Sequence, residues 1–265
     1  LALIDADGLV FMSSKDSLEE SLLILNEKIQ NIFDKTEATH YVFFISKGKY
    51  FRHDISKDYK NLRAKYSTKL KWLKTLKNYL IENWNAQSMD WVESDDLCSY
   101  FYNYPMKHYK TDFKEDGGIQ EAICPESTFI NDNQFHKEFP KYENNTIWSD
   151  VTKIICSPDK DLLQSIPGKH FNYTYKLEVK DDPSSVIKGW WVETNKIDAY
   201  KFQWIQMLMG DNADSIKCLD KVGEVKATKL INECNEGYSK FVLGKYVDHY
   251  QNEATAIYEF QKNYR

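Results

Sequence analysis

The acidic residues of this chain form four short clusters whose spacing could hold metal ions. The clusters are Asp5-x-Asp7, Glu93-Ser94-Asp95-Asp96, Asp159-x-Asp161 and Asp211-x-x-Asp214. Carboxylates this close together repel one another unless a cation or a proton lies between them. Oxygen ligands of this kind suit Mg²⁺ or Mn²⁺. The four clusters together therefore predict a site for divalent cations.

Each cluster on its own also fits a structural role. Asp5 and Asp7 could belong to a turn, and Ser94 could cap a helix whose first turn holds the acids that follow it. The Asp159 cluster fits an Asx-type turn, and the Asp211 cluster fits a loop between helices. The metal interpretation depends on all four clusters adjoining apolar segments. It also takes Asp5 and Asp7 as two positions on one face of an extended segment.

Short apolar runs and a long amphipathic segment predict the elements that must position these acids. The runs 1–5, 41–46 and 152–157 predict buried strands of a parallel sheet. Segment 16–34 carries Leu, Ile and Phe at helical spacing and predicts a helix. This alternation indicates an α/β fold, with a central, mostly parallel sheet flanked by helices. Because the carboxyl ends of parallel strands share one edge, the distant clusters could converge there.

The pattern of the chain changes at about residue 195. From 196 onward it is helical throughout, so we expect an α/β domain over 1–195 and a helical subdomain over 196–265. Segment 103–150 has no clear periodicity. A loop of that length without structure would be unusual, so we expect an inserted surface excursion with short elements that the pattern does not locate.

Composition limits the class of protein. The net charge of the 265 residues is −5, so any basic surface for nucleic acid must be local. The five cysteines form no CxxC pair, which argues against a zinc site or a disulfide framework and indicates a reducing compartment. No apolar run reaches transmembrane length. We therefore expect a cytoplasmic protein with no membrane partner, in the host cytoplasm if the source is viral.

Basic residues concentrate between positions 47 and 77, where 11 Lys and Arg stand against two Asp, with Tyr, Phe and Trp interleaved. A solvated amphipathic helix is a sufficient explanation for 69–77. The stretch 50–66 fits a different role, since mixed basic and aromatic residues bind single strands through backbone charge and base stacking. Acidic clusters beside such a stretch point to phosphodiester chemistry.

The order of these motifs resembles that of the structure-specific 5′-nuclease family, which includes flap endonucleases, the 5′-nuclease domain of bacterial DNA polymerase I and bacteriophage 5′→3′ exonucleases. The motifs are Asp5, DYKNLR (58–63), ESDD (93–96), DKDLLQ (159–164) and GDNADSI (210–216), with KVGEVKATKLI (221–231) in the hairpin position. They cover most of the chain, and DKDLLQ and GDNADSI are fairly specific. The resemblance implies a PIN-like fold with a helical, basic arch over about 47–80 and a C-terminal helix–hairpin–helix.

The resemblance also implies two-metal hydrolysis of phosphodiesters that leaves a 5′-phosphate, with two Mg²⁺ or Mn²⁺ as cofactors. The ligands of the first metal would be Asp5, Glu93, Asp95 and Asp159. The residues that hold or orient the second would be Asp161, Asp211 and Asp214, with Asp96 as a helper.

A set of basic residues would bind the substrate, if the resemblance holds. Lys60 and Arg63 would lie in the arch, where they polarise the scissile phosphate and clamp the strand. The DNA-binding residues would be Arg52, Tyr59, Gly223 and Lys226. The hairpin around Gly223 would hold the duplex backbone, and family members often bind a monovalent cation at this place. Whether this chain takes K⁺ there as a cofactor stays open. We expect the chain to be a monomer. Its expected partner is DNA with a 5′ end or flap. An RNA:DNA hybrid, and the choice between exonuclease and flap endonuclease, stay open.

Three departures from the family pattern stand out. The family usually places an Asp after its second strand, and Ser46 or Lys47 stands there in this chain. Asp7, where many relatives carry a neutral residue, could compensate for the missing charge. The hairpin keeps one glycine in place of paired glycines and prolines, and the excursion 103–150 lengthens a link that is usually short.

Two alternatives remain at this level. LIDADGLVF alone also resembles the nucleophile motif of haloacid-dehalogenase-type phosphatases, in which Asp5 would attack phosphate and Asp7 would act as an acid. That alternative leaves ESDD, DKDLLQ and the basic stretch without a role. Ser46 suits a degenerate, non-catalytic DNA-binding member, although every other ligand position is acidic.

Overall fold

The computed structural model describes the backbone of residues 1–60, 70–112, 119–125, 147–180, 182–217 and 219–264. Within these residues the core is a five-stranded sheet of order β2-β1-β6-β7-β8. Its strands are β1 (Ala2–Asp5), β2 (Tyr41–Phe44), β6 (Ile154–Cys156), β7 (Gly168–Leu177) and β8 (Val186–Thr194). All neighbours pair in parallel except β7 and β8, which are antiparallel. The predicted α/β fold with a mostly parallel sheet is confirmed, and the strands expected at 1–5, 41–46 and 152–157 are present.

Helices cover both faces of this sheet. They are α1 (Ala6–Ser13), α2 (Leu18–Thr36), α5 (Leu73–Trp84), α6 (Ser94–Asn103) and α8 (Lys160–Ser165), with a short α3 (Arg52–Ile55) and a 3₁₀ turn at Pro183–Ser185. Successive residues of β1 point to opposite faces. Ile4 packs in one core cluster with α1, α2 and α5, and Leu3 packs in another with residues of α6 and α8. The acid at the end of β1 is thereby fixed between two packed layers.

The local sequence explains where α2 begins and ends. The Ser17 hydroxyl accepts a hydrogen bond from the Glu20 N–H at 3.1 Å, which caps the helix. Glu37 adopts a left-handed conformation at its carboxyl end. This helix, predicted over 16–34, spans Leu18–Thr36 and buries Leu25, Ile29 and Ile32 against the sheet.

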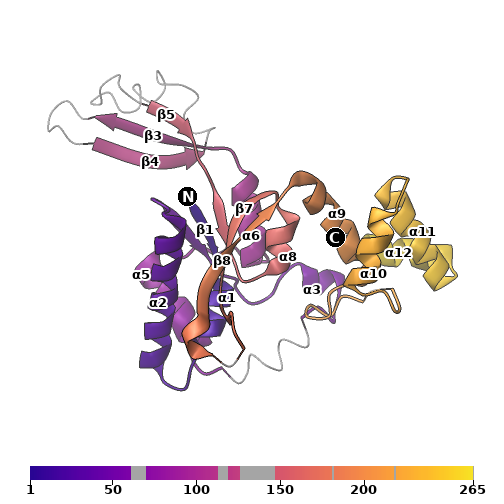
Figure 1. Cartoon of the computed structure of the whole chain (residues 1–265), viewed down its shortest axis with the longest axis horizontal. Helices are drawn as coiled ribbons and strands as arrows, with labels where there is room; N and C mark the ends of the chain where they lie inside the picture. Colours follow the sequence, from indigo (N-terminus) through magenta and orange to yellow (C-terminus); the bar gives the residue numbers. More distant parts are fainter. Residues whose placement is uncertain (61–69, 113–118, 126–146, 181, 218, 265) are drawn as a thin grey trace.

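The chain after β8 is helical, as the sequence predicts. Its helices are α9 (Lys196–Met209), α10 (Glu224–Asn232), α11 (Tyr238–Tyr250) and α12 (Glu253–Tyr264). They share a core cluster of their own, which includes Leu208, Ile231, Tyr246 and Ala256. Figure 1 shows these helices beside one end of the sheet, where α9 leads away from β8.

The excursion between α6 and β6 contains a second, antiparallel sheet. Its strands are β3 (Met106–Asp112), β4 (Ile119–Pro125) and β5 (Ile147–Asp150), in the order β4-β3-β5. The sheet projects from the body of the molecule near the start of the chain (Figure 1). It contains the short elements that the sequence could not locate. Among the described residues, no helix combines the length and the apolar character needed to cross a membrane.

Candidate metal centre

Asp5 is the last residue of β1, and its side chain is 6% exposed. The hydroxyls of Ser94 and Ser157 donate to its two carboxylate oxygens at 2.7 and 2.9 Å. Tyr173 donates from its hydroxyl to the backbone oxygen of Asp5. Burial, followed by the negative charge of Asp7, raises the pKa of Asp5 to about 6. Asp5 therefore links the start of α6 and the end of β6 from inside the protein.

The second acidic cluster forms the start of α6. Ser94 does not cap this helix, as it would in the structural alternative considered for this cluster. Glu93 is the N-cap residue and forms a reciprocal capping box with Asp96, while the Ser94 hydroxyl is used by Asp5. The carboxylates of Glu93, Asp95 and Asp96 each bring an oxygen within 4.8 Å of the others. Burial and then the charges of Asp96 and Glu93 raise the pKa of Asp95 to about 7.

The third cluster stands where β6 leads into α8. Asp159 caps this helix by accepting the Asp161 N–H at 2.8 Å, and its own N–H donates to the Ser157 hydroxyl at 3.0 Å. Burial, then the charges of Asp159 and Asp211, raise the pKa of Asp161 to about 6. The Oδ1 atom of Asp161 is buried and has no hydrogen-bond partner among the described residues.

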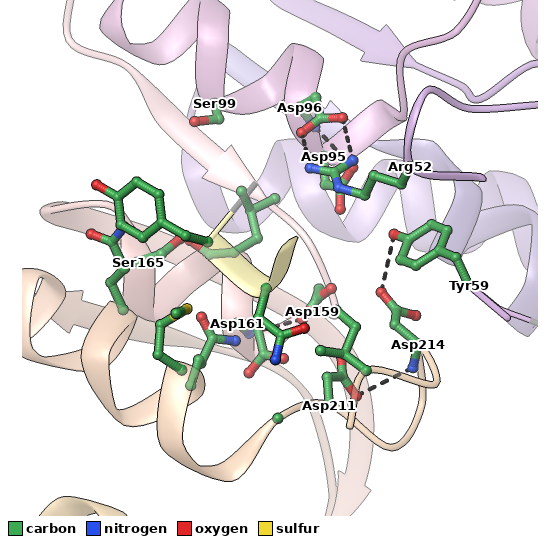
Figure 2. Close-up of a pocket in the computed structure, with 18 residues that line it drawn as sticks. Arg52, Tyr59, Asp95, Asp96, Ser99, Asp159, Asp161, Ser165, Asp211 and Asp214 are labelled. Atoms are coloured by element: carbon green, nitrogen blue, oxygen red, sulfur yellow. Dashed lines mark hydrogen bonds and ion pairs between the residues drawn. The ribbon is translucent and has the colours of Figure 1, made fainter. Parts of the chain in front are cut away.

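The fourth cluster lies in the turn after α9. Asp211 and Ile216 pair through two backbone hydrogen bonds of 3.1 and 2.7 Å. The Asp211 carboxylate accepts the N–H groups of Ala213 and Asp214 at 2.7 and 3.3 Å. These local bonds fix the turn, and the Asp214 carboxylate points toward the Tyr59 hydroxyl (Figure 2).

The last three clusters meet in one cavity of about 330 Å³. Its acidic lining residues are Asp95, Asp96, Asp159, Asp161, Asp211 and Asp214, from segments up to 119 positions apart in the chain. Figure 2 shows these carboxylates around a common space. Asp5 and Glu93, which we expected in the same cleft, do not line it: Glu93 is only 2% exposed. They lie behind the cavity and contact its wall through Ser94 and the α6 capping box.

Basic and aromatic side chains of residues 52–60 pack directly on the α6 acids. Arg52 donates to both oxygens of Asp96 at 2.6 Å each and to Glu93 at 2.8 Å. Lys60 forms an ion pair with Glu93. The Tyr59 hydroxyl lies 2.6 Å from Glu93 and 3.2 Å from Asp214. This segment thus joins α6 to the turn after α9, through contacts that the sequence pattern did not predict.

Asp7 and Ser46 occupy a neighbouring but different setting. Asp7 lies in the first turn of α1, so it does not share an extended face with Asp5 as expected. Its carboxylate pairs with Lys77 at 2.7 Å and accepts the Ser46 N–H at 3.3 Å. The Ser46 hydroxyl accepts the Ser94 N–H at 2.9 Å. Sequence reasoning assigned Lys77 to a solvated helix face, and only the fold brings it to Asp7.

The remaining predicted DNA-binding positions lie elsewhere. Gly223 precedes α10 as its N-cap residue, and Lys226 is exposed on that helix, with its ammonium 3.5 Å from the Lys221 carbonyl oxygen. Neither residue lines the acidic cavity. Arg63 and the rest of 61–69, in the predicted arch, lie outside the described residues.

The donors around the cavity fit a hard divalent cation. They are carboxylate oxygens, as Mg²⁺ and Mn²⁺ prefer. The buried Oδ1 of Asp161 has no other described partner, and burial followed by the neighbouring carboxylates raises the pKa values of Asp95 and Asp161, which a bound cation would oppose. Arg52 is the one cationic side chain among the described residues of the lining.

Comparison with known proteins identifies the fold. A structure of the bacteriophage T5 flap endonuclease, a pseudo-enzyme–product complex with DNA and metal ions, matches with a TM-score of 0.58 over 98% of this chain and 86% of that one, at 13% identity. The fold is that of a structure-specific 5′ nuclease. Bacteriophage T5 5′-exonuclease with bound zinc matches with a TM-score of 0.53 at 15% identity, over 98% of this chain and 87% of that one. No family model and no curated protein matches the sequence of this chain.

Proposed function

We propose that this chain is a metal-dependent 5′ nuclease that hydrolyses phosphodiesters in DNA. The observation that carries the proposal is the convergence of acids from α6, α8 and the turn after α9 on one cavity. These segments are separated by the whole inserted sheet and by the β7–β8 hairpin, so their meeting is a property of the fold. The structural neighbours, which include a T5 protein with DNA and metal ions, support the same activity.

The six lining acids would hold two divalent cations, Mg²⁺ or Mn²⁺, across this cavity. Such ions lower the pKa of an attacking water and stabilise the charge of an in-line displacement at phosphorus. Asp95, Asp159, Asp161 and Asp211 offer carboxylates for them. Both oxygens of Asp96 are bonded to Arg52, which favours a helper role for that residue. Buried Asp5 would orient Ser94 and Ser157 beneath the site.

The basic segment would act on substrate charge. Arg52 pairs with Asp96 of the cavity lining, and both Arg52 and Lys60 pair with Glu93 behind it, so the two cations would stand close to a substrate phosphate bound at the lining acids. Tyr59 would hold the turn of Asp214 in place. Arg63 would extend the same basic surface. Loss of a 5′-terminal nucleotide or flap with a 5′-phosphate on the product is the expected outcome.

The domain over 196–265 would hold the duplex. Gly223 stands at the amino end of α10, and Lys221 and Lys226 flank it. Free N–H groups at a helix start bind phosphate oxygens, which fits backbone contact without base recognition. A K⁺ ion at this turn, a monomeric state and activity on the RNA strand of an RNA:DNA hybrid belong to the same proposal.

Cleavage of 5′-labelled substrates tests the proposal. Flap, blunt duplex and RNA:DNA substrates are incubated with Mg²⁺, with Mn²⁺ and with EDTA. The expected result is release of short 5′-phosphorylated products that requires a divalent ion. The Asp161→Asn/Asp211→Asn double variant, purified in parallel, controls for contaminating nucleases. Metal-dependent cleavage by neither protein, or equal cleavage by both, would contradict the proposal.

The same preparations separate the two alternatives. A phosphatase that uses Asp5 as its nucleophile would turn over an aryl phosphate, and beryllium fluoride would inhibit it. The burial of Asp5 and the hydrogen bonds on both of its oxygens disfavour attack by that carboxylate. A non-catalytic member would bind all three substrates and cleave none.

A further inference from the structure

Trp91 has a backbone conformation that its residue type rarely adopts. Its φ is +69°, in the left-handed region where a side chain of this size meets steric strain and glycine is the usual occupant. Residues held in this region tend to occur at functional sites, where the surrounding structure maintains them. Trp91 stands in the loop between α5 and α6, two positions before the buried Glu93.

The surroundings of Trp91 hold its backbone and leave its ring available. The Phe51 N–H donates to the Trp91 carbonyl oxygen at 3.0 Å, and Tyr50 pairs with Trp91 in a parallel bridge. The Trp91 side chain nevertheless remains 49% exposed. A large aromatic ring on a fixed backbone, with half of its surface in water, is suited to contact a ligand.

Cations accompany the exposed rings of this surface. The Lys49 ammonium lies 4.7 Å from the centre of the Trp91 ring, and the Arg52 guanidinium lies 4.7 Å from that of Phe51, which is 37% exposed. Aromatic faces beside cations bind the bases and the phosphates of a single strand together. In a chain of net charge −5 these cations form a local basic surface, which favours a nucleic acid here over an apolar partner.

Trp91 is close along the chain to the candidate metal centre, although it does not line the acidic cavity. Two residue steps separate Trp91 from Glu93, a span of at most about 7 Å between their Cα atoms. Lys60 connects the two places, since it pairs with Glu93 and its ammonium lies 5.5 Å from the ring centre of Tyr50. A span of about 7 Å corresponds to about two nucleotide steps along a duplex strand. Glu93 lies behind the cavity but shares the α6 capping box with Asp96, which lines it, so a strand with a phosphate at these acids would place a nearby base at Trp91.

We propose that Trp91 is a stacking platform for an unpaired nucleobase of the strand whose phosphate lies at the acidic cavity. This inference rests on the proposed nuclease function and adds to it a base-contacting residue outside the acidic and basic sets. The stacked base fixes the register of the strand, so that the phosphate presented to the acids is set by a contact on the ring.

A double-mutant cycle between the ring and the base tests the platform. All proteins carry Asp161→Asn so that the probe is not cleaved in Mg²⁺, and fluorescence anisotropy measures their binding to a duplex with a fluorescent 5′ overhang. The second probe has the same backbone but abasic sites in the overhang. The parent should bind the abasic probe about 5- to 150-fold more weakly. Trp91→Ala should bind the two probes equally, and Trp91→Phe should keep most of the preference.

Two controls separate stacking from stability. Trp91→Gly removes the ring and the backbone strain together, whereas Trp91→Ala keeps the strain, so the glycine variant should be the more stable of the two. Both should lose the base preference to the same extent. Trp191→Ala is the matched control, because Trp191 is also exposed (38%), with the Lys169 ammonium 4.6 Å from its ring centre, but lies on β8 at the opposite edge of the sheet. That variant should behave as the parent.

The outcomes distinguish the platform from the nuclease proposal. If the parent binds the overhang and Trp91→Ala retains its full base preference, the platform is wrong while the nuclease proposal stands. If the parent binds neither probe, both are wrong. A loss of preference in Trp191→Ala equal to that in Trp91→Ala would assign the effect to general damage and would also overturn the platform.

Discussion

The two sides of the acidic cavity differ in how their charge is balanced. On the α6 side, Glu93 and Asp96 are paired with Arg52 and Lys60. On the other side, Asp159, Asp161 and Asp211 take part in none of the ion pairs found among the described residues. The carboxylates of Asp159 and Asp211 accept backbone N–H groups instead, at 2.8 and 2.7 Å, and the buried Oδ1 of Asp161 has no described partner.

This difference indicates that the acids on the two sides of the cavity have different functions. Backbone N–H groups orient a carboxylate but carry only partial charge, so the side formed by α8 and the turn after α9 retains a demand for an external cation. The α6 side carries its own cations, which a divalent ion or a substrate phosphate must engage or displace. We therefore expect the first side to dominate metal affinity and the second to couple metal to substrate.

The largest expected effect follows from removing charge on the unpaired side. Asp161→Asn should lower kcat by about 1000-fold or more, since its buried oxygen has no other described partner. DNA affinity should change by less than about threefold, because substrate binding depends mainly on basic residues. Single-turnover cleavage and anisotropy measure the two quantities. Asp248→Asn, a change at an acid whose side chain is 75% exposed, is the control and should leave both unchanged.

A second effect concerns pH. The folded-state pKa values of Asp5, Asp95 and Asp161 lie at about 6, 7 and 6, above the ordinary 3.8. Carboxyl groups whose pKa is raised by folding bind more protons in the folded state. Their contribution to the free energy of unfolding is therefore fully present below pH 4 and is lost as the pH rises through 6 to 7. In EDTA, the free energy of unfolding should therefore fall by about 3 kcal/mol across this window. Urea titrations at several pH values measure this free energy. With saturating Mg²⁺ it should change much less with pH than in EDTA, and an equal pH dependence in the two conditions would contradict metal binding by these acids.

A third effect tests the paired side. Arg52→Met leaves Glu93 and Asp96 with fewer cations, so in EDTA the chain should lose about 2 kcal/mol of stability. Mg²⁺ should restore most of this lost stability. The site should also be half-saturated at a lower Mg²⁺ concentration, because the Arg52 guanidinium no longer competes with the metal for the carboxylates. Isothermal titration and thermal unfolding give the two values. Lys49→Met, which breaks an exposed pair with Asp54, should show neither change.

The smallest expected effect concerns Ser46, which stands where the 5′-nuclease family usually has an Asp, and its neighbour Asp7. Asp7→Asn should raise the Mg²⁺ concentration for half-maximal activity by about two- to threefold, and Ser46→Asp should lower it. Lys77 already offsets the charge of Asp7, which keeps the effect small. Metal titrations of both variants that coincide with the parent would mean that Asp7 serves its structural partners, Lys77, the Ser46 N–H and the Ser94 hydroxyl, and not a metal ion.

The sequence predicted the elements whose patterns are local. The strands ending at Asp5 and before Asp159 followed from short apolar runs, and the α2 helix from its spacing of Leu and Ile. The start of α1 at Ala6 was missed, although buried Ala6, Leu9, Val10 and Ser13 have helical spacing. The hairpin of β7 and β8 was also missed, because polar and aromatic residues interrupt its alternation and Trp190 and Trp191 stand side by side.

The candidate site was predictable in its residue types but not in its pairings. The acids stood out because each cluster follows an apolar segment. The contacts of Arg52 with Asp96 and of Lys77 with Asp7 join positions that are 44 and 70 apart, and no local pattern encodes them. The exclusion of Glu93 from the cavity follows from the same pairings, since Arg52, Tyr59 and Lys60 cover it.

The placement of β1 in the middle of the sheet has a consequence for biosynthesis. This strand is synthesised well before one of its two neighbours, because β6 begins about 150 residues later at Ile154. At about 5–20 residues per second, the first strand waits roughly 10–30 s for that neighbour. The acids at 211 and 214 arrive later still. A nascent chain that has not yet reached residue 214 therefore lacks part of the candidate site, and the full set of acids can come together only after α9 and the turn that follows it have been made.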